Sequence, residues 1–89
     1  MTKVTRHTVE EIIENEKLNG YNFFEDRADI ENEVVIKKKN EKWVVYVTDE
    51  RASIITGSKV FFDNEEEAIE NFLRRLRGLD WLKKNYDGL

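Results

Sequence analysis

Apolar positions along the chain change spacing twice, from helical to alternating and back to helical. Between residues 8 and 18 they recur at the spacing of one helix face. Thr8 and Glu11 have the spacing of a capping box, and Gly20 suits the left-handed position that ends a helix. The pattern therefore predicts a first helix over 8–18, preceded by a flexible segment over 1–7.

The alternating part of the chain predicts a β-hairpin. Two β-rich runs, 33–39 and 42–48, flank a two-residue turn at Asn40-Glu41. Such a turn pairs Lys38 with Trp43 in an antiparallel ladder. This register places the following apolar residues on one face, the predicted core face: Val34, Ile36, Trp43, Val45 and Val47. The other face is only partly polar, because it carries Val35, Val44 and Tyr46. Either another segment covers this second face, or the face is an exposed apolar patch that serves a function.

The segments around the hairpin give weaker patterns. Residues 52–56 and 59–62 are β-rich and are expected to form a third and a fourth strand, with a bend at Gly57. Residues 21–32 are acidic and begin with three aromatic residues. They have no clean period, so a loop with a short strand at 22–25 is expected there.

The third part of the pattern is helical again. Asn64 and Glu67 form a second capping box, and apolar residues from 68 to 76 recur with a period of 3.6. Gly78 is expected to end this helix and Asp80 to begin a short further one, within a helical region over 64–84. The elements predict a single α+β domain over 1–89: an N-terminal helix, a three- to four-stranded antiparallel sheet over 33–62, and a C-terminal helix packed on one face in two layers.

Composition narrows the class of protein. The 89 residues include no cysteine, which excludes disulfides, thiol nucleophiles and cysteine-based zinc sites. A small domain without disulfides is typical of a reducing compartment, and no apolar run reaches the roughly 18–20 residues of a membrane span. A cytoplasmic location is therefore expected.

Candidate chemistry is sparse. His7 is the only histidine and lies near the N-terminus, and Ser53 and Ser58 are not in a nucleophile elbow. The four glycines are too far apart to form a phosphate-binding loop. We expect no catalytic residue, no cofactor and no metal ligand, and hence a protein that is not an enzyme.

Charge is unevenly distributed along the chain, whose net charge is -4. Residues 1–33 carry nine acids and four bases, whereas residues 34–62 carry six bases and three acids. Separated charge of this kind can steer association with a charged partner. Two basic clusters, 37–42 and 74–77, leave a nucleic-acid-associated regulator as an alternative, although the net charge is unfavourable for it.

A protein-binding domain is the remaining class. The candidate contacts lie in an acidic segment and in a charged turn: Glu25, Asp26, Asp29, Glu31, Asp49, Glu50 and Arg51. A generic interaction or scaffold module, including one that forms a homodimer, stays open as a further alternative.

Three segments carry a resemblance to a known family: 21–32 (YNFFEDRADIEN), 42–51 (KWVVYVTDER) and 61–73 (FFDNEEEAIENFL). Over roughly residues 8–80 the chain resembles small immunity proteins of bacterial polymorphic toxin systems, of the kind encoded beside toxins with LXG-type export domains. The resemblance implies a protein that binds and blocks a cognate toxin in the producing cell and has no catalytic residues. A nuclease toxin would present a basic face, for which the acids of 25–33, including Glu33, would be natural contacts.

Overall fold

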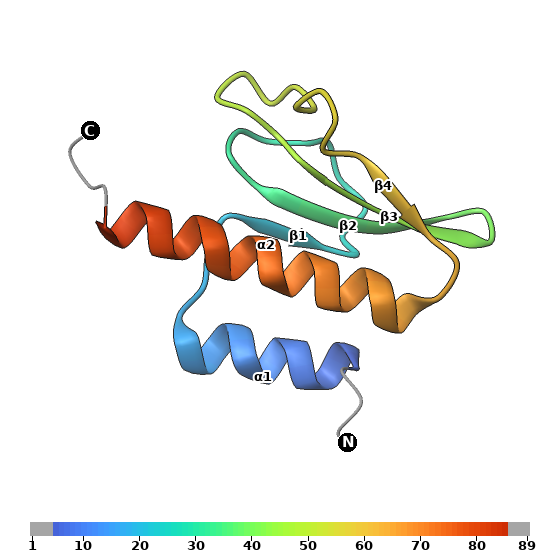
Figure 1. The fold of residues 1–89 in the computed structure, drawn as a ribbon, viewed down its shortest axis with the longest axis horizontal. Helices are drawn as coiled ribbons and strands as arrows, with labels where there is room; N and C mark the ends of the chain where they lie inside the picture. The colour runs from blue at the N-terminus through green and yellow to red at the C-terminus, as the bar shows by residue number, and fades with distance from the viewer. Residues whose placement is uncertain (1–4, 86–89) are drawn as a thin grey trace.

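A computed structural model describes residues 5–85, apart from the side chains of Lys83 and Lys84. Two helices and one four-stranded sheet form two layers, with both helices on the same face of the sheet (Figure 1). The elements in chain order are α1 (Arg6–Glu16), β1 (Tyr21–Phe23), β2 (Val34–Lys39), β3 (Lys42–Val47), β4 (Val60–Phe62) and α2 (Glu65–Asn85). The α+β class and the two-layer arrangement predicted from the sequence are confirmed.

The β2–β3 hairpin has the predicted register. Lys38 pairs with Trp43 and Ile36 with Val45, around a turn in which Asn40 has a left-handed φ of 60°. The alternation of side chains then fixes both faces of the sheet. Val34, Ile36 and Val45 are fully buried beneath the helices, and the Nζ of Lys38 lies 5.2 Å from the centre of the Trp43 ring.

The sheet is mixed, and the expectation of a purely antiparallel sheet was wrong. Its order is β1-β2-β3-β4, and β1 runs parallel to β2, with Tyr21 beside Val34. Loop 24–33 runs from the C-terminal end of β1 back to the level of Tyr21, where β2 begins. The two strands can therefore pair in parallel. The hydrophobic pattern indicates which face a strand buries but not the direction of its neighbour.

The segment between β3 and β4 forms turns instead of the predicted strand over 52–56. A single bridge joins Thr48 to Ile54. The Oδ1 of Asp49 accepts hydrogen bonds from the backbone N–H groups of Arg51 and Ser53, at 2.8 and 3.0 Å. An aspartate that bonds the backbone two residues on favours a turn over a strand. Gly57 has a φ of 85°, which fits the predicted bend.

Helix α1 is displaced toward the N-terminus from its predicted range. Thr5, not Thr8, caps it, because the Thr5 hydroxyl accepts from the Thr8 N–H at 3.3 Å. The helix ends at Glu16, and Lys17 takes the left-handed capping conformation. Gly20 has a positive φ of 75°, but it lies beyond the cap. Of the segment expected to be flexible, residues 1–4 lie outside the described residues, and residues 5–7 belong to the first turn of α1 and its cap.

Helix α2 begins as predicted and continues further than predicted. The Asn64 Oδ1 accepts from the Glu67 N–H at 2.8 Å. The helix runs unbroken through Gly78, so the expected break and the cap at Asp80 do not occur. Gly78 is exposed, and the partly buried Leu79 beside it packs on the core. Packing on one side thus offsets the roughly 1 kcal/mol by which glycine disfavours a helix.

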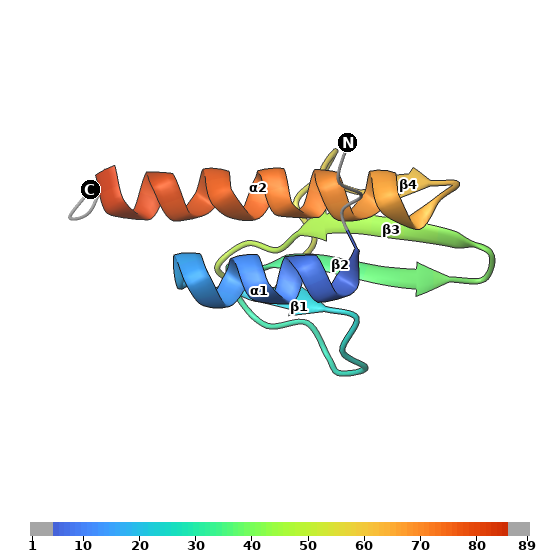
Figure 2. The same cartoon turned by 90° about the horizontal axis from the view of Figure 1, so that it is seen from below.

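The two helices run side by side in the same direction (Figure 2). Arg6 at the start of α1 donates to Glu65 at the start of α2, at 2.7 Å. At the other end of α1, Glu16 accepts two hydrogen bonds from Arg77. Arg77 therefore lies in mid-helix and joins the two helices. No helix in the described part of the chain is long and apolar enough to cross a membrane.

Candidate functional site

The face of the sheet opposite the helices, called here the second face, carries its own apolar cluster. Val35, Val44 and Tyr46 form it, and each is at most 6% exposed. The hydroxyl of Tyr46 donates to the Oδ1 of Asp29 at 2.6 Å. Loop 24–33 therefore covers the end of this face nearest β1, which answers the question that the sequence left open.

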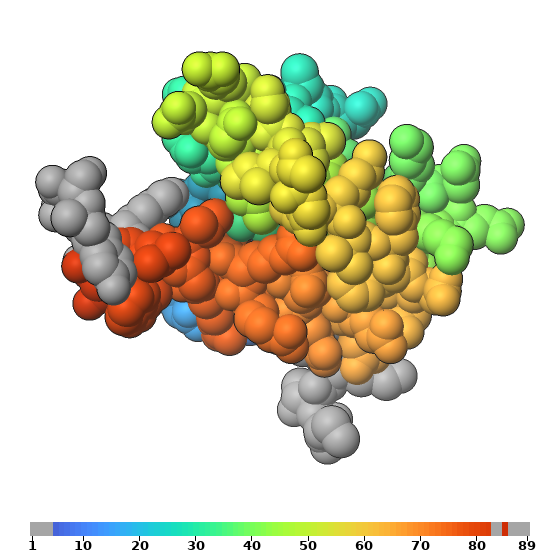
Figure 3. Space-filling view, turned by 45° about the horizontal axis from the view of Figure 1, so that its top comes forward, coloured from blue at the N-terminus to red at the C-terminus, as the bar shows by residue number. Residues whose placement is uncertain are grey.

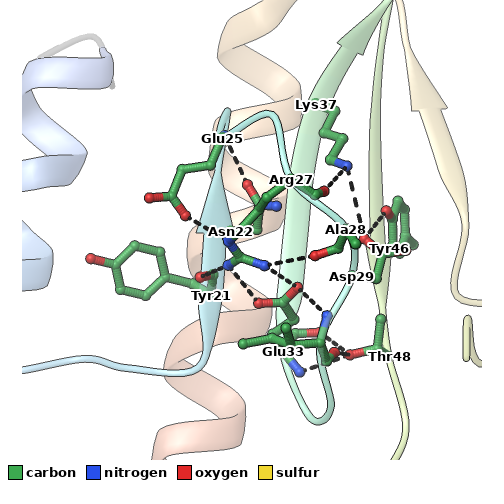
Figure 4. Close-up of polar contacts among 11 residues, drawn as sticks. Tyr21, Asn22, Glu25, Arg27, Ala28, Asp29, Glu33, Lys37, Tyr46 and Thr48 are labelled. Carbon is green, nitrogen blue, oxygen red and sulfur yellow. Dashed lines mark hydrogen bonds and ion pairs between the residues drawn. The ribbon is translucent and has the colours of Figure 1, made fainter. Parts of the chain in front are cut away.

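One ion pair holds loop 24–33 in shape (Figure 4). Arg27 donates from its two terminal nitrogens to the two carboxylate oxygens of Glu33, at 3.1 and 2.9 Å. The same guanidinium donates to the carbonyl groups of Tyr21 and Ala28. Glu33 is fully buried, so its charge is balanced by a bidentate partner within the protein.

Backbone contacts complete the network around Glu33. Its Oε1 accepts from the Ile30 N–H at 3.2 Å, and its own N–H donates to the Thr48 hydroxyl at 2.9 Å. The Thr48 hydroxyl donates in turn to the Ile30 carbonyl at 2.7 Å. The last part of the loop is thus hydrogen-bonded within itself and to Thr48, the residue that follows β3.

A residue with a left-handed backbone conformation lies at each end of the loop. Phe24 and Asn32 have left-handed φ values of 60° and 51°. Such a conformation is unfavourable for a bulky side chain and persists only where the surroundings impose it. The ring of Phe24 lies 3.7 Å below the guanidinium of Arg6, and 4.9 Å separates its centre from that of Phe23. These contacts hold the loop in one conformation.

Two pKa values reflect this network. Hydrogen bonding to Glu33 raises the pKa of Arg27 further above its ordinary value. Burial, and then the hydrogen bond to Asp29, raise the pKa of the Tyr46 phenol well above its ordinary value. Arg27 is therefore a permanent cation here, and Tyr46 is a permanent donor at neutral pH.

The structure brings the two predicted charged segments together. The Asn32 N–H donates to the Asp49 carbonyl at 3.0 Å, so loop 24–33 lies against the turn 49–53. In Figure 3 these segments, teal and yellow-green, form the top of the molecule side by side. The last part of the loop, with Glu31, therefore lies beside the turn that carries Glu50, whereas Asp26, in the first part of the loop, lies near Lys37 and Lys38.

The predicted residues of the two segments divide into two groups. Glu25 pairs with Arg27 at 3.1 Å, Asp29 bonds Tyr46, and Asp49 caps its own turn. The others are exposed and have no side-chain partner within the described residues: Asp26, Glu31, Glu50 and Arg51. We use the name acidic end for Asp26, Glu31 and Glu50 together, because they are the exposed acids of the loop and the turn that have no ion-pair partner in the described chain. Asp26 lies nearer to Lys37 and Lys38 than the other two acids do.

Glu33 was wrongly expected to be a contact, since solvent does not reach it. The sequence reasoning also missed Arg27. A signal for it was present, because Arg27 is the only basic residue between Lys17 and Lys37. A lone base inside an acidic segment is a good candidate for an internal ion pair.

The basic clusters considered for nucleic acid are largely used inside the protein. The Lys37 Nζ donates to the Arg27 carbonyl, and Arg75 donates to the Ser58 carbonyl at 2.7 Å. Arg77 is held by α1 as described above. Among the described residues, no group of three or more His, Cys, Asp or Glu side chains could hold a metal ion.

Comparison with known families identifies the class of protein. The model of one family, immunity protein 59, matches residues 2–86. The chain belongs to the immunity protein 59 family. This confirms the resemblance to small immunity proteins that the sequence motifs indicated. No curated protein and no solved structure gives a significant match to this member of the immunity protein 59 family.

Proposed function

We propose that this immunity protein binds a cognate bacterial toxin and neutralises it by covering its active surface, in the cytoplasm of the cell that makes both. The observation that carries the proposal is the match of nearly the whole chain to a family of immunity proteins. The protein acts by binding and performs no catalysis.

The acidic end is the surface that we assign to the toxin. Asp26, Glu31 and Glu50 have no ion-pair partner in the described chain. Part-buried hydrogen bonds hold the loop that carries Asp26 and Glu31, and the Asp49 carboxylate holds the turn that carries Glu50. A preorganised surface loses little conformational entropy on binding. Its charge fits a basic toxin surface, such as one that binds nucleic acid.

Co-expression with the toxin encoded beside this gene tests the proposal. We expect the immunity protein to restore growth of cells that produce the toxin, and light scattering of the purified mixture to show a 1:1 complex. Growth arrest despite soluble immunity protein, together with two separate species at micromolar concentration, would contradict the proposal.

A nucleic-acid-associated regulator is the other candidate that the sequence left open. The engagement of Lys37, Arg75 and Arg77 within the protein leaves it without a specific supporting observation.

A further inference from the structure

Loop 24–33 covers only the half of the second face nearest β1. The register continues this face across the sheet from Lys37 to Val44 and to Phe61 on β4. Phe61 is 50% exposed, which is unusual for a phenylalanine in a strand. Nearby, Ile54 is 40% exposed and lines a hollow of about 250 Å³ whose lining also includes Val44. The half nearest β4 therefore presents apolar groups to solvent.

Lysines surround these apolar groups. Lys39 and Lys42 are direct cross-strand partners, and Lys59 lies with its Nζ 5.8 Å from the centre of the Phe61 ring. Lys42 is neutralised by Asp63 at 2.7 Å. Lys39 and Lys59 have no acidic partner within the described chain. These two lysines are therefore available to bind a negatively charged partner.

The chain itself shows the chemistry that this face accepts. Asp29 of loop 24–33 lies on the second face, where its Oδ1 accepts from the Tyr46 hydroxyl and lies 3.8 Å from the Lys37 Nζ. An acidic segment is thus already docked over the covered half. The open half continues the same pattern, with Lys39 and Lys59 as the cations and Phe61 as the apolar group.

We propose that the open half of the second face is a second docking surface, which takes an acidic segment of the toxin with an apolar side chain at its centre. The apolar side chain contacts Phe61 and Ile54, and the flanking carboxylates bind Lys39 and Lys59. An exposed aromatic residue within a charged rim is the arrangement of an interface hot spot. This inference rests on the proposed function, since it takes the toxin as the partner.

Charge favours an acidic protein segment over the other occupants. A nucleic acid would bring a long row of phosphates close to a protein whose net charge is -4. A second copy of this chain, docking its acidic end on this face, would make a contact that repeats without closing into a dimer. A short acidic segment of the toxin can bind the lysines without bringing a long row of negative charges to the protein. It also does not create a contact that repeats from copy to copy.

The test measures the dissociation constant of the toxin complex for variants of the full-length protein. Lys39→Glu with Lys59→Glu, and separately Phe61→Thr, should each weaken binding by about 10- to 100-fold. Arg74→Glu controls for one charge reversal, against each of Lys39→Glu and Lys59→Glu made singly, and Leu82→Gln controls for the loss of an exposed apolar side chain. Both side chains are exposed on α2 at the other face of the sheet. The controls should bind the toxin as the wild type does. Thermal melting of each variant verifies folding, and threonine keeps the β-propensity of position 61.

The outcomes separate the inference from the proposed function. Failure of the wild-type protein to bind the toxin overturns both proposals. Tight binding by the wild type, unchanged in the Lys39/Lys59 and Phe61 variants, overturns this inference alone. Salt-dependent binding of a fluorescent single-stranded oligonucleotide, lost in the lysine variant, would assign the face to nucleic acid instead. Concentration-dependent self-association that is lost in the same variant would assign it to a second copy.

Discussion

Glu33 accepts two hydrogen bonds from Arg27 at a position that solvent does not reach. The two residues bracket most of the loop that covers one end of the second face. Their ion pair therefore does not act as a surface contact. It fixes the path of the backbone that presents Asp26 and Glu31 to solvent.

Replacing Glu33 by glutamine should destabilise the protein. The amide keeps the shape of the carboxylate but removes its charge and turns one of its two acceptors toward Arg27 into a donor. We expect the free energy of unfolding to fall by about 2–4 kcal/mol, measured by urea denaturation.

Glu31→Gln is the matched control for this experiment. Its side chain is exposed and has no partner in the described chain, so the change in stability should stay within about 0.5 kcal/mol. Equal stabilities of the two variants would show that the Arg27–Glu33 pair does not hold the loop.

Tyr46 should make stability depend on alkaline pH. The pKa of its phenol is raised above the ordinary value of 10.0 in the folded protein. Between those two pKa values the unfolded chain loses the phenolic proton while the folded chain keeps it. Stability from this group is thus fully present below pH 10 and falls as the pH rises above it.

Tyr46→Phe tests this dependence by chemical denaturation at a series of pH values. The variant should be less stable than the wild type at neutral pH by about 1–2 kcal/mol, because it loses the hydrogen bond to Asp29. The difference should shrink above pH 10. A difference that stays constant or grows with pH would contradict the assigned environment of Tyr46.

Gly78 and Gly57 should respond to alanine in opposite directions. A Cβ would meet no atom within 4 Å at either position, so packing does not distinguish them. Gly78 lies within α2, where alanine should add about 0.5–1 kcal/mol of stability. Gly57 has a φ of 85°, where alanine should cost about 1–2 kcal/mol. Destabilisation by Gly78→Ala would show that α2 is broken at this position.

The parts of the fold that were predictable depend on local signals. The register of the β2–β3 hairpin follows from two alternating runs and a two-residue turn, and the start of α2 follows from Asn64. The parallel direction of β1 could not be predicted, because it depends on where loop 24–33 returns the chain. The continuation of α2 through Gly78 likewise depends on tertiary packing, through Leu79.

The candidate site was predictable in position but not in detail. The concentration of charged residues marked both segments. Sequence alone could not separate Asp29 and Asp49, which serve the fold, from Asp26, Glu31 and Glu50, which face solvent. That distinction depends on a partner distant in the chain, Tyr46 for Asp29, and on the backbone N–H groups that Asp49 bonds within its own turn.

The association rate with the toxin tests the central claim most directly. The variant D26K/E31K/E50K reverses the acidic end, and E10K/E14K/E70K changes the net charge equally at exposed sites on the helices. Stopped-flow measurement at low salt should show association slowed by about 10-fold or more in the first variant relative to the second. The gap should narrow as salt is added. Equal association rates for these two variants at every salt concentration would contradict the assignment of the acidic end to the toxin.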